Sequence, residues 1–116
     1  MARILDCPVP AGRLRVRVAD SFVSRALGLL VGAPLAPEEA LLIAPCSSIH
    51  TFGMRYPIDV AFIDGDARIV RVYPRVPAGR VRFAFGARAV LEMRAGAAAR
   101  LGLDAGVRLA ALAATA

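Results

Sequence analysis

The sequence contains no lysine, asparagine, glutamine or tryptophan, and it has only one histidine and two cysteines. Sugar-binding sites depend on tryptophan stacking and on side-chain amides, so this composition disfavours a sugar-binding role. With one histidine and no CxxC or HExxH spacing, the common zinc motifs are excluded. The nucleotide-binding patterns GxxxxGK and GxGxxG and the hydrolase pattern GxSxG are missing too, so no motif supports those functions.

Long apolar runs are also missing. The N-terminus carries Arg3 and Asp6, and the apolar run from Ala40 to Pro45 is much shorter than the roughly 20 residues that span a bilayer. We therefore expect a cytoplasmic protein that makes no contact with membranes. In a reducing compartment, Cys7 and Cys46 are expected to remain unpaired thiols.

Arginine supplies every basic residue, and the formal net charge is +6 at pH 7. The length of 116 residues is that of one domain, residues 1–116, with a core of Leu, Ile, Val, Phe and Met side chains. The arginines are scattered from Arg3 to Arg108, which is typical of a solvated surface. A nucleic-acid-binding face made of Arg13, Arg15 and Arg17 is therefore the least favoured functional alternative.

The hydrophobic pattern predicts mainly β structure. Leu14 to Val18 alternates apolar and basic residues, as a half-buried strand does. The clearest feature is a hairpin, in which Ile58 to Phe62 and Ile69 to Tyr73 flank the turn residues Asp64, Gly65 and Asp66. Further strands are predicted at Ala40–Ala44, Ser48–Phe52, Ala89–Met93 and Val107–Leu112, with a weak strand or loop at Arg80–Phe85.

Two short helices complete the predicted elements. The first begins at Asp20 or Ser21 and runs to Leu30, and the second covers Ala95 to Leu101 and ends at Gly102. Pro74 and Pro77 are expected to break the second strand of the hairpin. The predicted fold class is mainly β: a small antiparallel sandwich or partly closed barrel, jelly-roll-like, with one or two short helices.

Three stretches of the sequence resemble one known family. They are RALGLL (Arg25 to Leu30), SSIHTFGMRYPIDVAFID (Ser47 to Asp64) and VLEMRAGAAARLGLDAGVRL (Val90 to Leu109). Together they are similar to the patterns of domain of unknown function family 192, an uncharacterised family of bacteria and archaea. The resemblance implies a compact, mainly antiparallel β sandwich with a packed helix. It implies no activity.

The middle stretch holds the candidate binding residues. In extended backbone Phe52, Met54 and Tyr56 would share one face and could line an apolar cleft. We therefore predict a non-enzymatic binding or accessory domain that offers a cleft around residues 46–59 to a small molecule or a protein segment. The candidate cleft residues are Cys46, His50, Thr51, Phe52, Met54, Tyr56 and Asp59.

An enzyme is the main alternative, using Cys46 as nucleophile, His50 as base and Asp59 to orient the imidazole ring. The same three residues, with Cys7 or Asp64, have ligand types that suit a divalent metal ion. Neither alternative has a supporting motif, so we assign no catalytic residue, no metal and no cofactor.

Arg25 and Asp59 both lie in apolar contexts, where an unpaired charge would be costly. We predict that they form a structural ion pair. The protein is expected to be a monomer or a weak homodimer, in which the last predicted strand could pair with a second copy.

Overall fold

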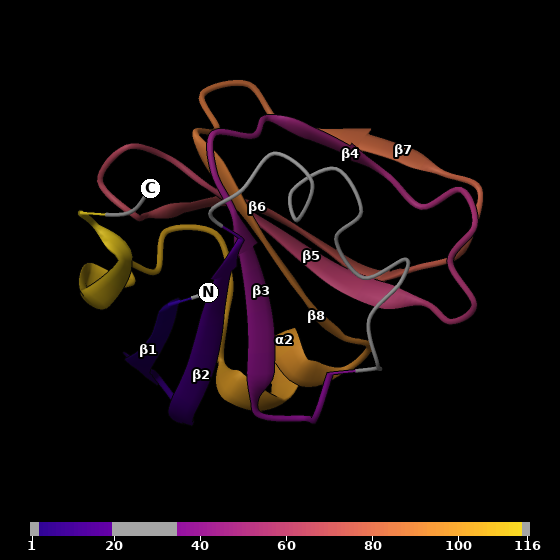
Figure 1. Ribbon diagram of the computed structural model, residues 1–116. Helices are drawn as coiled ribbons and strands as arrows, with labels where there is room; N and C mark the ends of the chain where they lie inside the picture. The colour runs from indigo at the N-terminus through magenta and orange to yellow at the C-terminus, as the bar shows by residue number, and fades with distance from the viewer. Residues whose placement is uncertain (1–2, 20–34, 115–116) are drawn as a thin grey trace.

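The computed structural model describes residues 3–19 and 35–114, and these form a mainly β structure (Figure 1). The main sheet has six strands in the order β1-β2-β3-β8-β5-β6, and a second sheet pairs β4 with β7. The strands are β1 (Arg3–Val9), β2 (Gly12–Ala19), β3 (Glu39–Ile43), β4 (Ser48–His50), β5 (Ile58–Ile63), β6 (Ile69–Val76), β7 (Val81–Phe83) and β8 (Ala89–Arg94). The structure is not a closed barrel, because β1 and β6 are the two edges of the main sheet.

The main sheet is mixed rather than purely antiparallel. Its β2 and β3 strands run parallel, whereas its other neighbouring pairs are antiparallel. A parallel pair needs a long connection, and the sequence separates the end of β2 at Ala19 from the start of β3 at Glu39.

The predicted hairpin is confirmed as β5 and β6. Its turn is held by Asp64, whose Oδ1 accepts the backbone N–H groups of Asp66 and Arg68. The β6 strand continues past Pro74, contrary to the prediction that Pro74 would break it. Proline is tolerated there because β6 is an edge strand and needs no donor on its outer side.

The two faces of the main sheet bury separate core clusters. The first cluster includes Leu14, Leu42 and Leu91 and is covered by α2 (Ala97–Leu101) and the 3₁₀ helix η1 (Ala110–Leu112). The second cluster includes Phe62 and Val90 on the opposite face. Because β5 is buried on both faces, its alternate residues belong to different clusters.

The chain after β8 forms helices where the sequence predicted a helix and then a strand. The helix α2 ends at Gly102, whose φ of 75° is a left-handed conformation, and a Cβ there would lie 3.0 Å from Pro10. The predicted strand Val107–Leu112 is wrong, because Ala110–Leu112 is the 3₁₀ helix η1. Spacing of three residues lets Leu109 and Leu112 enter the same cluster, which strand alternation would prevent.

Other differences from the predictions are local. Strand β1 was not predicted, and β4 ends at His50 rather than Phe52. The predicted helix from Asp20 or Ser21 to Leu30 lies outside the described residues. Within residues 3–19 and 35–114, no helix is both long and apolar enough to cross a bilayer.

Candidate functional site

Asp59 is buried on the first face of the main sheet, with 1% of its surface exposed. Its Oδ1 accepts the N–H of Arg75 at 2.8 Å, and its Oδ2 accepts those of Gly96 and Ala98 at 3.0 and 2.9 Å. One carboxylate therefore ties β6 to the start of α2. Its role in this geometry is structural.

The ion pair predicted between Asp59 and Arg25 remains a prediction, because Arg25 lies outside the described residues.

The segment from Thr51 to Pro57 is a series of turns rather than the extended chain that the sequence suggested. Thr51 is buried; its hydroxyl donates to the carbonyl of Pro77 and accepts the N–H of Arg80, at 2.6 and 2.9 Å. Gly53 has a φ of 84°, and the N–H of Met54 bonds back to the carbonyl of Thr51. The segment is thus anchored from one end by Thr51.

These turns separate the three residues that were expected to share a face. Met54 and Tyr56 are half-buried against the second core cluster. Phe52 is 54% exposed and stacks on His50, with ring centroids 5.3 Å apart and planes inclined by 26°. Phe52 consequently belongs to the surface and the other two residues to the core.

The outward face of the β4–β7 sheet carries a row of exposed apolar groups. His50 pairs with Val81 across the two strands, and Phe83 is two residues beyond Val81 and so on the same face. The ring of Phe85 contacts that of Phe83 edge-on, with centroids 5.5 Å apart. The resulting exposed strip consists of Phe52, His50, Val81, Phe83 and Phe85.

The exposed strip is unusual for its apolar content. Among the described residues, five large hydrophobic side chains are exposed, and all except Ile4 belong to the strip. Phe85 is 92% exposed, so folding gains almost nothing from its ring. A concentration of exposed apolar groups on one face marks an interaction site more often than a single exposed residue does.

The net positive charge of the chain comes from the same part of the sequence. Residues 46–58 and 69–91, called here the acid-free segments although other stretches such as residues 7–19 also lack acidic residues, contain six of the fifteen arginines and no Asp or Glu. The nine remaining arginines are matched by the nine acidic residues elsewhere, so the acid-free segments account for the whole formal charge of +6.

Two of these arginines lie next to the strip. The guanidinium groups of Arg71 and Arg82 are 4.6 and 5.6 Å from the ring centroid of Tyr73. The hydroxyl of Tyr73 in turn donates to the carbonyl of Phe83 at 2.8 Å. These contacts hold both guanidinium groups against Tyr73, and Arg82, which alternates with Val81 and Phe83 on β7, lies on the face of that strand opposite to the exposed rings.

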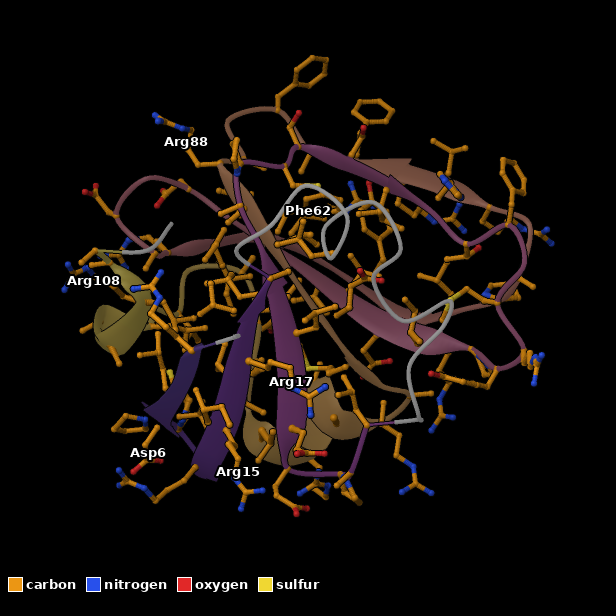
Figure 2. The ribbon with its side chains drawn as sticks, in the orientation of Figure 1. Asp6, Arg15, Arg17, Phe62, Arg88 and Arg108 are labelled. Atoms are coloured by element: carbon orange, nitrogen blue, oxygen red, sulfur yellow. The ribbon has the colours of Figure 1, made fainter. Side chains whose placement is uncertain are left out.

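Two other arginines of the acid-free segments, Arg75 and Arg88, extend toward other parts of the chain. Arg75 reaches Gly96, and Arg88, labelled in Figure 2, reaches Gly65.

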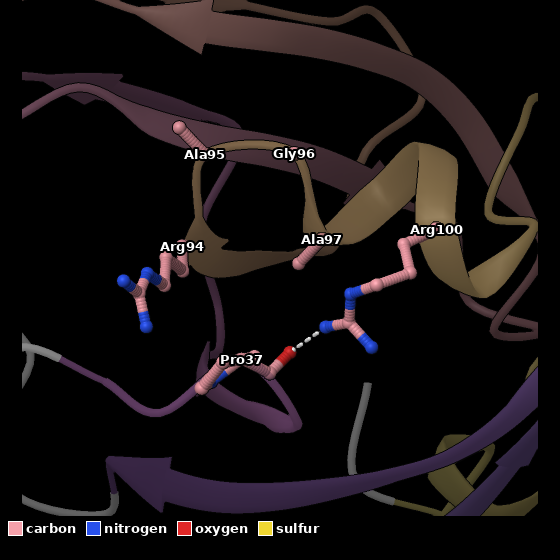
Figure 3. A pocket seen from close by; sticks show the side chains of 6 residues that line it. All are labelled: Pro37, Arg94, Ala95, Gly96, Ala97 and Arg100. Atoms are coloured by element: carbon pink, nitrogen blue, oxygen red, sulfur yellow. Dashed lines mark hydrogen bonds between the residues drawn. The ribbon is translucent and has the colours of Figure 1, made fainter.

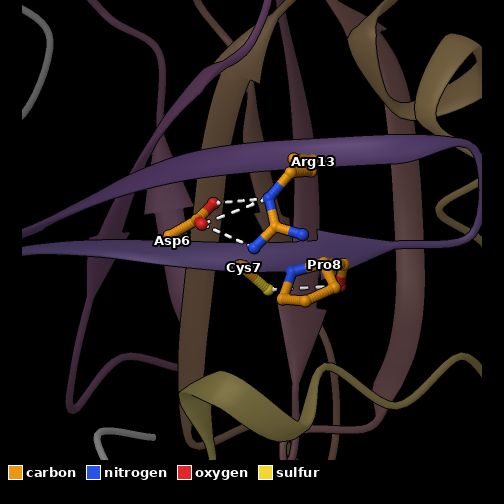
Figure 4. A network of polar contacts seen from close by, with 4 residues as sticks. All are labelled: Asp6, Cys7, Pro8 and Arg13. Atoms are coloured by element: carbon orange, nitrogen blue, oxygen red, sulfur yellow. Dashed lines mark hydrogen bonds and ion pairs between the residues drawn. The ribbon is translucent and has the colours of Figure 1, made fainter.

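The basic face suggested by the sequence, Arg13, Arg15 and Arg17, differs from the strip because acidic residues lie beside it. Arg13 donates to the carboxylate of Asp6, with Nε 3.1 Å from both oxygens (Figure 4), and Arg15 lies 3.6 Å from Glu39. The hydrogen bond to Arg13 lowers the pKa of Asp6. The charges of Arg13 and Arg15 are therefore offset by adjacent carboxylates.

Cys46 is half-buried; its thiol donates to the carbonyl of Ser48 at 3.0 Å. Together with Ser47, Ala87 and Arg88 it borders an open hollow of about 450 Å³. His50 faces solvent on the strip. Asp59 lies on the first face of the main sheet, opposite to the second core cluster that Cys46 packs against. In the described part of the chain, no three His, Cys, Asp or Glu side chains gather as a metal site would require.

Glu92 is a buried carboxyl group that the sequence reasoning did not single out. It is 6% exposed, and its strand neighbours Leu41 and Val60 belong to the second core cluster. Burial raises its pKa to about 7. Burial, and then the nearby charge of Glu92, raises the pKa of Tyr56. The hydroxyl of Tyr56 is buried without a hydrogen bond within the described structure.

The sequence reasoning also missed Val81, Phe83 and Phe85. One signal was available, namely the absence of acidic residues between positions 69 and 91. Exposure of the rings could not be inferred, because an alternating strand looks the same whichever face is buried.

Comparisons with known proteins place the chain in a family. The model of family DUF192, described as "Uncharacterized ACR", matches residues 8–111. The UPF0127 protein PH1112 of Pyrococcus horikoshii is 39% identical over an alignment of 82 residues, and the match covers 59% of this chain and 67% of that protein.

Two crystal structures share the fold. A protein of unknown function from Novosphingobium aromaticivorans has a TM-score of 0.76 at 24% identity, covering 90% of this chain and 81% of its own. A suggested transcription regulator from Sinorhizobium meliloti has a TM-score of 0.79 at 23% identity, covering 94% and 92%. The family match spans nearly the whole sequence, and the chain belongs to domain of unknown function family 192, whose members are uncharacterised.

Proposed function

We propose that this chain is a non-enzymatic binding domain, and that the exposed strip is where it holds single-stranded nucleic acid. The observation that carries the proposal is the coincidence of four exposed large apolar side chains with the segments that hold all of the net charge. A cytoplasmic location is part of the proposal.

The chemistry of the strip favours unpaired bases. Aromatic rings with open faces stack on bases of any sequence, and arginines beside them bind the phosphates. In double-stranded nucleic acid the bases are already stacked on each other, so the rings would contribute much less. We expect single strands to bind more tightly than duplexes of the same sequence.

The measurement is fluorescence anisotropy of a labelled oligothymidylate of about 12 nucleotides, within the usual site size of such proteins. Affinity should fall as salt is raised, with a slope of about −0.7 for each phosphate contact. Replacing both Phe83 and Phe85 by alanine should weaken binding roughly 5- to 150-fold for each base that loses its stacking partner. Thermal melts should be nearly unchanged, because both rings are more than half exposed.

Ile4 provides the matched control. It is 62% exposed but lies on β1, outside the strip, so Ile4→Ala should leave the affinity unchanged. Arg82→Ala should weaken binding and reduce the salt slope by roughly one contact, whereas Arg108→Ala should do neither.

Three outcomes would overturn the nucleic-acid assignment. Binding to phosphatidylserine vesicles without binding to the oligonucleotide would make the strip a membrane surface. Salt-independent binding of a peptide or small molecule would instead support the partner predicted from the sequence, which is a small molecule or a protein segment. Equal loss of affinity in Ile4→Ala and in the double phenylalanine variant would show that the strip is not the binding surface.

A further inference from the structure

We propose that a second site, separate from the exposed strip, binds a small molecule through a phosphate group. The site is the hollow of about 300 Å³ between the end of β8, the helix α2 and the residues before β3. Its lining consists of Pro37, Arg94, Ala95, Gly96, Ala97 and Arg100. Figure 1 places α2 at the lower end of the molecule and β4 and β7 at the upper right, so the strip does not reach it.

Positive charge is concentrated in the hollow. Arg94 and Arg100 approach it from two sides (Figure 3), and none of the six lining residues is acidic. A third guanidinium group, that of Arg75, lies beside Gly96, where a Cβ would be 3.5 Å from its terminal nitrogen. Guanidinium groups can donate two parallel hydrogen bonds to one phosphate, which makes arginine clusters suited to this ligand.

The position of one guanidinium is fixed in advance. Arg100 donates a hydrogen bond to the carbonyl of Pro37, which holds its side chain across the mouth of the hollow (Figure 3). Four of its five N–H groups are not needed for that bond. A side chain that is already ordered loses less entropy when a ligand binds.

The backbone of α2 is not expected to bind the ligand, because Asp59 already accepts the N–H groups of Gly96 and Ala98. The site therefore depends on the arginine side chains. The small side chains of Ala95 and Ala97 leave the space open, and the volume exceeds that of a phosphate ion. It is of the size that holds a small organic ligand, which points to a small phosphomonoester.

The test uses inorganic phosphate as the probe, with the ionic strength held constant by sodium chloride. Isothermal titration should show saturable binding, and the backbone amide resonances of Ala95 and Ala97 should shift with the same midpoint. Arg94→Ala and Arg100→Ala should each weaken binding roughly tenfold to a hundredfold, as expected for a charge-assisted hydrogen bond.

Arg68→Ala is the matched control. Like Arg100, Arg68 is exposed and donates one hydrogen bond to a backbone carbonyl, that of Gly106, but it lies outside the hollow. Its replacement removes the same charge and should leave phosphate binding unchanged. The proposal is overturned if phosphate does not bind saturably, if Arg94→Ala binds like the unaltered protein, or if Arg68→Ala loses as much affinity as Arg100→Ala.

The two proposed sites can fail separately. If the unaltered protein binds phosphate but not the oligonucleotide, only the role of the strip is contradicted. If it binds the oligonucleotide but not phosphate, only the role of the hollow is contradicted.

Discussion

The Asp59 side of the molecule and the exposed strip treat polar and apolar groups in opposite ways. Around Asp59 a buried carboxylate meets three backbone donors, and the surrounding apolar side chains are buried. On the strip, phenylalanine rings face solvent beside arginines that no acidic residue of their own segments neutralises. Burial and pairing stabilise the first region, whereas nothing about folding accounts for the second. The first region therefore contributes to folding stability, and the second is available for the binding that we propose.

The largest expected effect comes from breaking the Asp59 region. Asp59→Ala leaves the buried N–H groups of Arg75, Gly96 and Ala98 without their acceptor, which should lower the free energy of unfolding by about 3 to 5 kcal/mol. Urea denaturation followed by circular dichroism measures it. Asp104→Ala is the control, because among the described residues that exposed carboxylate accepts one backbone N–H, that of Ala105. Equal losses in the two variants would contradict the structural role of Asp59.

The same series can test the predicted ion pair. If Arg25 pairs with Asp59, Arg25→Ala should destabilise the protein by a similar amount. If Arg25→Ala is as stable as the unaltered protein, the ion pair is contradicted and Asp59 acts through its three backbone hydrogen bonds alone.

A somewhat smaller effect is expected from Glu92, a carboxyl group that is 6% exposed. Because burial raises its pKa from 4.5 to about 7 in the folded state, the folded protein binds this proton more tightly than the unfolded chain. The stabilisation is complete below pH 4.5 and is lost as the pH rises to about 7, a change of about 3 kcal/mol.

Glu92→Gln removes that dependence. The difference in unfolding free energy between Glu92→Gln and the unaltered protein should therefore grow in favour of the variant between pH 5 and pH 7. Denaturation at several pH values measures the difference. A constant difference over this range would mean that Glu92 is charged in the folded protein without penalty.

The smallest effect is expected on the β1–β2 hairpin. The Asp6–Arg13 pair has good geometry, but both side chains are about two-thirds exposed, and exposed pairs contribute little to stability. Arg13→Ala should melt within the repeat error of the unaltered protein. A clear drop in melting temperature would instead make this pair part of the stabilised region.

Much of the sheet could be predicted from the sequence, because its strands depend on local patterns. The alternation in Leu14–Val18 and the turn residues Asp64–Asp66 identified β2 and the β5–β6 hairpin. The candidate cleft was harder to predict from the sequence. Alternation suggested that Phe52, Met54 and Tyr56 share a face, but the hydrogen bonds of Thr51 to the chain at Pro77 and Arg80 impose turns instead.

The sequence by itself determined that this is a mainly β member of an uncharacterised family, and that its excess charge comes from segments without acidic residues. Composition and short-range periodicity contain that information. Only the tertiary structure decided that Asp59 meets α2, that Glu92 is buried, and that the rings of Phe83 and Phe85 face outward. Each of these depends on contacts between residues far apart in sequence, or on which face of a strand the rest of the molecule covers.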